Sequence, residues 1–318
     1  MKIQFVKYIL TFFIMVPGVV NACPSAALEG GLLIKNSKLI NPAASSAVTA
    51  VQKGHLWVLG NKIQKIFKQS CSIQTKVSVK VINGEGKWVI TGLHDMKMHN
   101  FGAGLVPTFK EEDKGRVSAY ELGEKLLYAG TTTYQDLNSA EVPRLNPKGK
   151  PIFPTEVSIF EVRNKKKAGK LANHPNLYVT GSLYTVAGGG GAFGTSHIVT
   201  TVASAKAELQ KHIKFGNPDV ITIYYKNDSD PASPVKGYMD KTVMEELVKS
   251  AKAYGKKTVV LAGSWQDLRD AVDAGADMVT PTGSGEIPKD VPQLLLESGT
   301  TIVPSIAFHQ EMALYETK

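Results

Sequence analysis

Residues 84–100 read Gly-Glu-Gly-Lys-Trp-Val-Ile-Thr-Gly-Leu-His-Asp-Met-Lys-Met-His-Asn, and this stretch decides the fold. A short apolar segment ends at a glycine, and a strand-like segment follows it. Because successive side chains of a strand point to opposite faces, Asp95, Lys97 and His99 share one face. A neutral imidazole on that face can bind a metal ion, whereas a protonated lysine has no lone pair to offer. Of Lys97 and His99, only His99 can therefore act as a metal ligand on this face.

This stretch resembles the amidohydrolase superfamily, especially its imidazolonepropionase-like and prolidase-like members. In that family, a small β-domain leads into a first barrel strand that carries a His-x-His pair of metal ligands. Here the pair reads Lys97-Met98-His99. Segments 129–133, 173–191 and 255–277 resemble later parts of the family in the same order. The resemblance implies hydrolysis of carbon–nitrogen bonds with one or two divalent metals such as zinc.

The periodicity of the chain indicates the fold class. Between residues 31 and 82, short alternating segments and Gly-Asn or Asn-Gly turns favour an antiparallel β-unit. After residue 92, apolar strands alternate with helices that end at glycines, as in parallel βα units. We therefore predict an α/β protein, with a small N-terminal β-sandwich portion over 23–90 and an amidohydrolase-like (β/α) TIM barrel over 91–318. The strand at 300–305 resembles the family's penultimate one, so the barrel is predicted to be incomplete.

Other metal-binding positions that the resemblance implies are also replaced. Thr222 stands at the place of a carbamylated lysine that bridges two metals, and Leu261 and Pro281 stand at the places of histidines. None of these three side chains can supply the implied ligand. His99 is the single metal-ligand candidate, and transition-metal sites normally have three or more donors. We therefore expect no bound cofactor.

The remaining histidines in the barrel region give no sequence signal for a metal site. None shows a ligand spacing such as His-Glu-x-x-His; these residues are His174, His197, His212 and His309.

Three functions follow as alternatives. The first is an exported protein with a degenerate metal site that is catalytically silent or binds a small molecule. Its cleft would include Asp95, Lys97, His99 and Thr222. The second is a hydrolase of carbon–nitrogen bonds in cyclic amides or dipeptides, as the resemblance implies. The third is a structural subunit whose barrel is completed by a partner chain or a second copy, because open sheet edges leave backbone groups unpaired.

The N-terminus predicts export. Lys2 and Lys7 precede a short apolar run, and a small-residue cleavage pattern follows it, so residues 1–22 are predicted to be a signal peptide. The mature protein is then periplasmic or secreted. Cys23 also fits a bacterial lipobox, and its lipidation would anchor the protein to a membrane. Without lipidation, a disulfide between Cys23 and Cys71 is available under oxidising conditions.

The charge pattern of the chain bears on the class of partner that the protein binds. The 318 residues carry a formal net charge of +9, with lysines in loop-like and helix-like segments. No aromatic residues are interleaved with these lysines, and no nucleic-acid-binding motif accompanies them. We expect a small-molecule ligand and no nucleic-acid partner.

Overall fold

The computed structural model describes residues 23–41, 51–98, 119–142, 158–191, 196–225, 237–281 and 286–304. The chain separates into two compact units, Met1–Thr91 and Gly92–Lys318. The predicted signal peptide and His99 lie outside the described residues. Among the helices of the described ranges, none is both long enough and apolar enough to cross a membrane.

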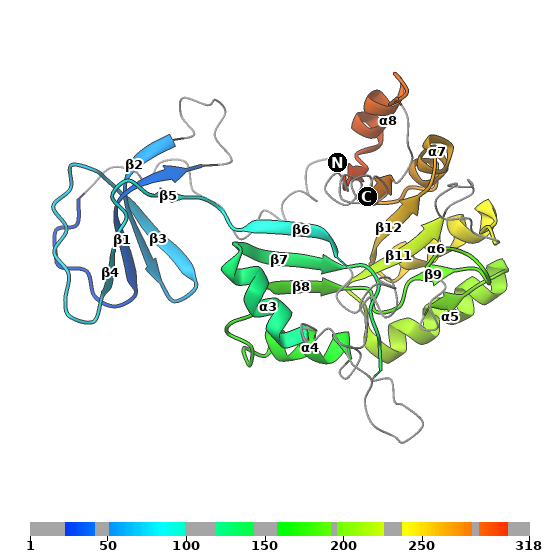
Figure 1. The fold of residues 1–318 in the computed structure, drawn as a ribbon, viewed down its shortest axis with the longest axis horizontal. Helices are drawn as coiled ribbons and strands as arrows, with labels where there is room; N and C mark the ends of the chain where they lie inside the picture. The colour runs from blue at the N-terminus through cyan, green and yellow to red at the C-terminus, as the bar shows by residue number, and fades with distance from the viewer. Residues whose placement is uncertain are drawn as a thin grey trace, which may run out of the picture. The chain divides into compact units, whose positions relative to one another are not determined.

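The first unit is built on a β-sheet with the strand order β3-β2-β1-β4, in which β5 also pairs with β1. Its strands are β1 (Leu32–Ile40), β2 (Val51–Leu59), β3 (Lys62–Lys68), β4 (Lys80–Asn83) and β5 (Trp88–Val89) (Figure 1). β2 is antiparallel to both β1 and β3, as the alternation and the turn at residues 60–61 predict. The antiparallel prediction is wrong for β4 and β5, which run parallel to β1. Residues 69–79 carry the chain from β3 across to the other side of β1, so the strand that follows points the same way as β1.

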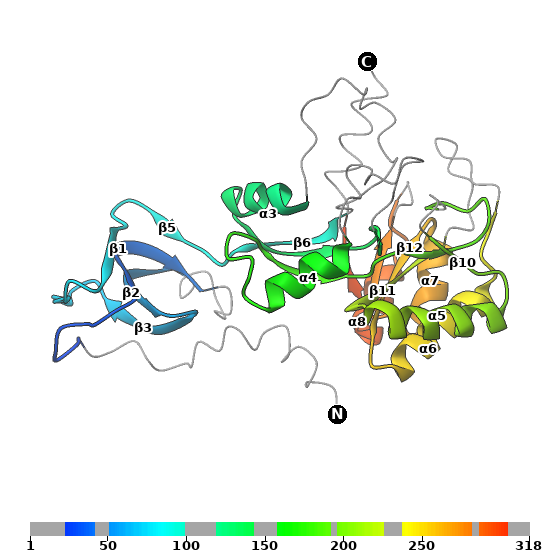
Figure 2. The same cartoon turned by 90° about the horizontal axis from the view of Figure 1, so that it is seen from below.

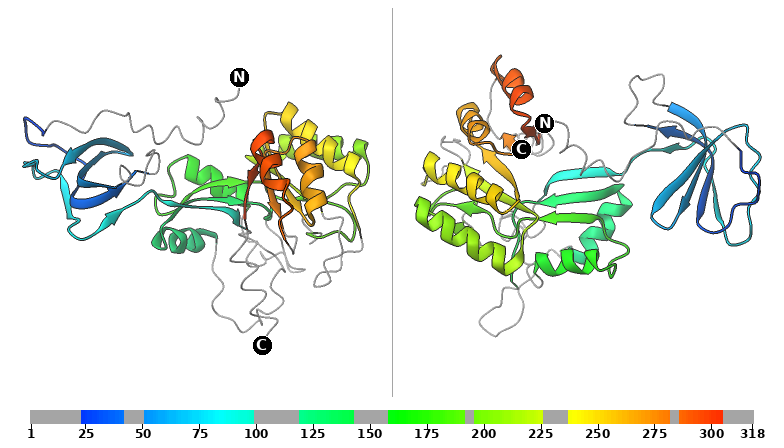
Figure 3. Two further views of the ribbon diagram at one scale, coloured as in Figure 1. Left: turned by 90° about the horizontal axis from the view of Figure 1, so that it is seen from above. Right: turned by 180° about the vertical axis from the view of Figure 1, so that it is seen from behind.

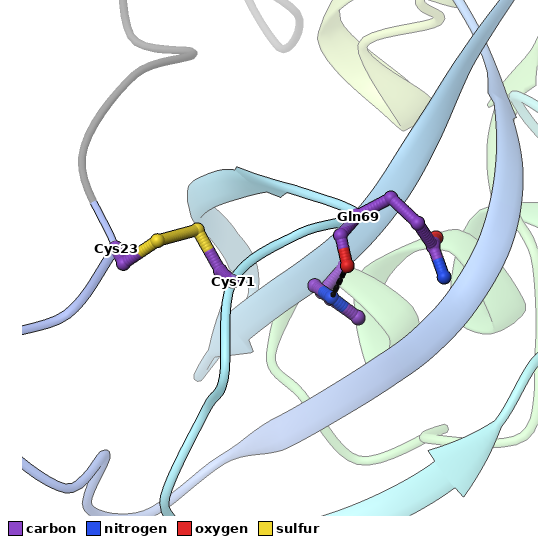
Figure 4. Close-up of a disulfide and its surroundings, with 4 residues drawn as sticks. Cys23, Gln69 and Cys71 are labelled. Carbon is purple, nitrogen blue, oxygen red and sulfur yellow. Dashed lines mark hydrogen bonds between the residues drawn. A yellow bond between two sulfur atoms is a disulfide. The ribbon is translucent and has the colours of Figure 1, made fainter.

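A disulfide between Cys23 and Cys71 fastens the start of the first unit, with the two Cα atoms 5.2 Å apart (Figure 4). The structure thus contains the bridge that the sequence offered as the alternative to lipidation. Cys71 is buried in an apolar cluster with Leu33 and Phe67. Nearby, the backbone oxygen of Gln69 lies 3.3 Å from Nε2 of the buried His55. The bridge therefore joins the N-terminal segment to the core of this unit.

Strands and helices alternate through the second unit, which confirms the α/β class. The strands are β6 (Leu93–Met98), β7 (Thr131–Asp136), β8 (Asn176–Val179), β9 (Tyr184–Thr185), β10 (His197–Ile198), β11 (Val220–Tyr225), β12 (Lys257–Ala262), β13 (Met278–Pro281) and β14 (Thr301–Ile302). The helices are α3 (Ala119–Tyr128), α4 (Ile159–Lys167), α5 (Val202–Gly216), α6 (Lys241–Ala253), α7 (Trp265–Asp273) and α8 (Val291–Ser298).

The strands of the second unit form two parallel sheets, β6-β7-β8 and β10-β9-β11-β12-β13-β14. A backbone hydrogen bond links them where β8 ends, because Asp219 N–H, just before β11, donates to Val179 O. Helices α3 and α4 lie beside β7 and β8, and α5 and α6 lie beside β9 and β11 (Figures 1 and 2). Closure of the strands into a barrel and a complete N-terminal sandwich stay predictions.

The two faces of the larger sheet carry different clusters. Ile221, Ile223 and Tyr225 of β11 pack in the main core with side chains of α5 and α6. Figure 3 shows both helices running along the larger sheet. Val220 and Tyr224 point the other way and join Leu261 in a second apolar cluster. We call these the helix face and the inner face of the sheet. The inner face is where the family resemblance implies the metal site.

Candidate functional site

Strand β6 carries two of the predicted cleft residues. Asp95 and Lys97 are both half-buried, and Oδ1 of Asp95 accepts a hydrogen bond from the backbone N–H of Lys97 at 3.1 Å. His99 follows β6 and lies outside the described residues, so its role as a metal ligand stays a prediction. Asp95 and Lys97 thus form a local pair at the end of the smaller sheet.

Thr222 lies in the larger sheet and is fully buried. Alternation along β11 places it on the inner face between Val220 and Tyr224, and its Oγ1 lies 2.6 Å from Oγ1 of Thr180. Leu261 is buried in the same apolar cluster. These residues give the inner face no metal donor at the positions that the resemblance implies on β11 and β12.

Replacing Thr222 with valine tests its role. Valine has nearly the same shape but leaves the buried Thr180 hydroxyl without its partner, so we expect a loss of about 1–2 kcal/mol in the free energy of unfolding. Metal content should not change. Urea denaturation and elemental analysis measure the two quantities, and a variant of unchanged stability that loses metal would show that Thr222 is a ligand.

A different group of residues can hold a metal ion. Glu141 follows β7, His197 lies in β10, and His212 lies in the second half of α5. One ligand atom from each side chain lies within 4.8 Å of the other two. The expectation of no cofactor is therefore wrong, because the fold brings together donors that the linear spacing did not connect.

Glu141 is the centre of this group. Its Oε1 lies 2.9 Å from Nε2 of His197 and 3.1 Å from Nε2 of His212, and it also accepts the backbone N–H of Ser182 at 2.9 Å. The side chain of His212 is fully buried, whereas those of Glu141 and His197 are 14% and 16% exposed. Nδ1 of His212 lies 2.9 Å from the hydroxyl of Tyr184. The group is enclosed but not sealed from solvent.

Burial and the histidine contacts set the charge of the group. Burial alone would raise the pKa of Glu141, but its contacts with His197 and His212 lower that pKa by more, so it lies well below the usual range. Burial lowers the pKa of His212 and outweighs the attraction of Glu141. Burial also raises the pKa of Tyr184, as do the nearby charges of Glu141 and Glu208. Near neutral pH, an ionised carboxylate therefore faces a neutral imidazole, which are the protonation states that metal ligands need.

Sequence reasoning missed this group for a physical reason. Glu141 and His197 are 56 residues apart in sequence, and His197 is positioned by the pairing of β10 with β9. Neither residue belongs to a motif with its own signal.

No protein-family model matches the sequence, and no curated protein matches it. Solved structures do match. The chain is similar to a Xaa-Pro dipeptidase with bound methionine, with a TM-score of 0.64, 22% identity, and 87% of this chain and 67% of that one covered. A prolidase complexed with N-methylphosphonate-L-proline has a TM-score of 0.63 at 14% identity, over 86% of this chain and 65% of that one.

The ochratoxinase of A. niger is similar too, with a TM-score of 0.62, 13% identity, and 86% of this chain and 64% of that one covered. The chain thus spans about two thirds of the length of these structures. At such low identities the likeness is one of fold. The motif in residues 84–100 indicated this fold, and the chain has the fold of the prolidase-like amidohydrolases.

Proposed function

We propose that the protein is a metal-dependent hydrolase that cleaves carbon–nitrogen bonds in small amide substrates. The observation that carries the proposal is the match of 84–89% of the chain to solved structures named as a dipeptidase, prolidases, ochratoxinase and molinate hydrolase, among others. A bound divalent ion would polarise the substrate carbonyl and lower the pKa of a bound water. The net charge of +9 favours substrates that carry a free carboxylate, such as dipeptides and N-acyl amino acids.

The chain's own residues at the end of β6 would orient such a substrate. Asp95 is held by the backbone of Lys97, and an ammonium at Lys97 can attract a carboxylate or a developing oxyanion. His99 is predicted on the same strand face and can move a proton near neutral pH.

The proposal is tested by incubating the protein with a panel of Xaa-Pro dipeptides and N-acyl amino acids. Hydrolysis is measured as the release of the free amine. We expect turnover that a chelator abolishes and that added Zn²⁺, Mn²⁺ or Co²⁺ restores. His99→Ala should lower kcat/KM by about 100-fold if it transfers a proton. His94→Ala is the matched control, because it removes an exposed histidine of β6. No turnover on any substrate with any of the three metals would overturn the proposal.

A non-catalytic binding protein is the second candidate. The apolar inner face around Leu261 and the paired hydroxyls of Thr180 and Thr222 favour it, because they offer no metal donor where the resemblance implies one. Thermal-shift screening of the same panel separates the candidates, since a binding protein would be stabilised by a compound that it does not cleave. Export, and completion of the barrel by another chain or copy, stay predictions from the sequence.

A further inference from the structure

We propose that Glu141, His197 and His212 bind one divalent ion of the zinc class on the helix face of the sheet. This site is separate from the inner face that the family resemblance implies. The inference stands whether or not the protein is a hydrolase, because it rests on the contacts of these three side chains alone.

Packing places the group on the helix face. Tyr184, which contacts His212, belongs to the main core together with residues of α5 and α6. Its neighbour Leu183 points the other way and joins the inner cluster with Leu261. Since His212 lies on α5, a metal held by this group would lie between that helix and the sheet.

The surroundings of His212 favour a cation beside its ring. Its Nε2 is fully buried and has no hydrogen-bond partner among the described residues, although Oε1 of Glu141 lies 3.1 Å away. When the ring proton is on Nδ1 and is donated to the Tyr184 hydroxyl, the lone pair on Nε2 faces a carboxylate oxygen. Such an arrangement is repulsive unless a cation lies between the two atoms.

The spacing of the donors suits a small ion. Ligands about 2.0–2.1 Å from a tetrahedral Zn²⁺ lie about 3.3 Å from one another. Oε1 of Glu141 lies 2.9 Å from one histidine Nε2 and 3.1 Å from the other. His197 and Glu141 are partly exposed, so they can move apart by the few tenths of an ångström that an ion needs.

An oxygen atom also faces the Nδ1 atom of each histidine. The hydroxyl of Tyr184 lies 2.9 Å from Nδ1 of His212, and Oε2 of Glu208 lies 3.9 Å from Nδ1 of His197. Metal-bound histidines almost always donate their other N–H to such an oxygen, which fixes the tautomer and the ring. Imidazole donors select Zn²⁺, Co²⁺ or Ni²⁺ over Mg²⁺ and Ca²⁺. Three protein ligands leave a fourth position for water.

Metal binding to the purified full-length chain, stripped with a chelator, tests the inference. We expect one equivalent of Zn²⁺ by elemental analysis, and Co²⁺ absorption bands of a four- or five-coordinate ion. Saturating Zn²⁺ should raise the melting temperature by about 5 °C or more, because an ion bound only by the folded state stabilises it. X-ray absorption of the Zn²⁺-loaded wild type should show two imidazoles, and a spectrum without imidazole would overturn the inference.

Variants identify the ligands. Glu141→Gln and His197→Ala should each weaken Zn²⁺ binding by about 100-fold or more. Even residues that only hydrogen-bond to the metal ligands contribute about 10–100-fold to metal affinity. His174→Ala is the matched control, because it removes another buried histidine of the second unit and should leave the affinity unchanged. If both variants keep wild-type affinity and His99→Ala loses it, the metal lies at the end of β6 and the inference fails. Zn²⁺ held by this group in a protein that cleaves no substrate would uphold the inference and refute only the proposed function.

Discussion

Arg163→Met should lower the free energy of unfolding of the second unit by about 3 kcal/mol, because three oxygen atoms lose the charged donor that they share. Arg163 lies in α4 and is 5% exposed. Its guanidinium donates to the backbone oxygens of Gly216 and Asn217, both at 2.9 Å, and lies 3.3 Å from Oδ2 of Asp219. Methionine would keep part of the packing against Phe160 but satisfy none of these oxygens.

The matched control is Lys167→Met, because Lys167 pairs with the same Asp219 carboxylate but lies on its solvent-exposed side. Its Nζ lies 2.7 Å from Oδ1 of Asp219, but its side chain is 58% exposed. Exposed ion pairs contribute about 0.2–1 kcal/mol, so this variant should lose less than about 1 kcal/mol. Hydrogen exchange of the β11 amides reports the opening of this unit alone. If the two variants lose equal amounts of unfolding free energy, the buried contacts of Arg163 add no stability beyond that of an exposed ion pair.

Much of the second unit could be predicted because its signals are local. Helix α5 follows a Thr201 cap that accepts from Ser204 N–H, and Asn217 ends it in a left-handed conformation. The strands β11 and β12 read as continuous apolar runs because both of their faces are covered. The alternation of strands and helices in this unit could therefore be predicted from the sequence.

Helix α4 escaped prediction although its cap is regular. Ser158 accepts from Phe160 N–H, but the helix is nine residues long and ends in three consecutive lysines. Those lysines give a polar segment with little amphipathic pattern, and only Ile159, Phe160, Val162 and Arg163 are buried. The direction of β4 and β5 also escaped, because alternation shows that a segment is a strand but not which way it runs beside its neighbour.

The candidate site also has positions that the sequence pointed to and a group of residues that it did not reveal. At Thr222 and Leu261, where the resemblance implies metal ligands, the structure shows a paired hydroxyl and an apolar side chain. The group of Glu141, His197 and His212 depends on a loop, a two-residue strand and a helix that meet through tertiary packing. Periodicity within each segment carries no information about that meeting.

Cys23→Ser should destabilise the first unit by about 2–4 kcal/mol. The bridge closes a loop with a sequence separation of 48 residues, for which the chain-entropy model gives about 4 kcal/mol as an upper value. Cys23 is the better position to replace because it is exposed, whereas Cys71 is buried and a serine there would add the cost of a buried hydroxyl. Fluorescence of Trp57, which packs on the same cluster as Cys71, reports unfolding of this unit.

Reduction provides the control for this variant. Dithiothreitol should lower the stability of the wild type to that of Cys23→Ser and leave the variant unchanged, because the variant has no bridge to reduce. Mass spectrometry of the mature N-terminus also decides between the two fates of Cys23, since a sulfur in the disulfide with Cys71 is not free to carry a lipid. A wild type that reduction does not affect, with a diacylglyceryl mass on Cys23, would contradict the bridge and place the protein at a membrane surface.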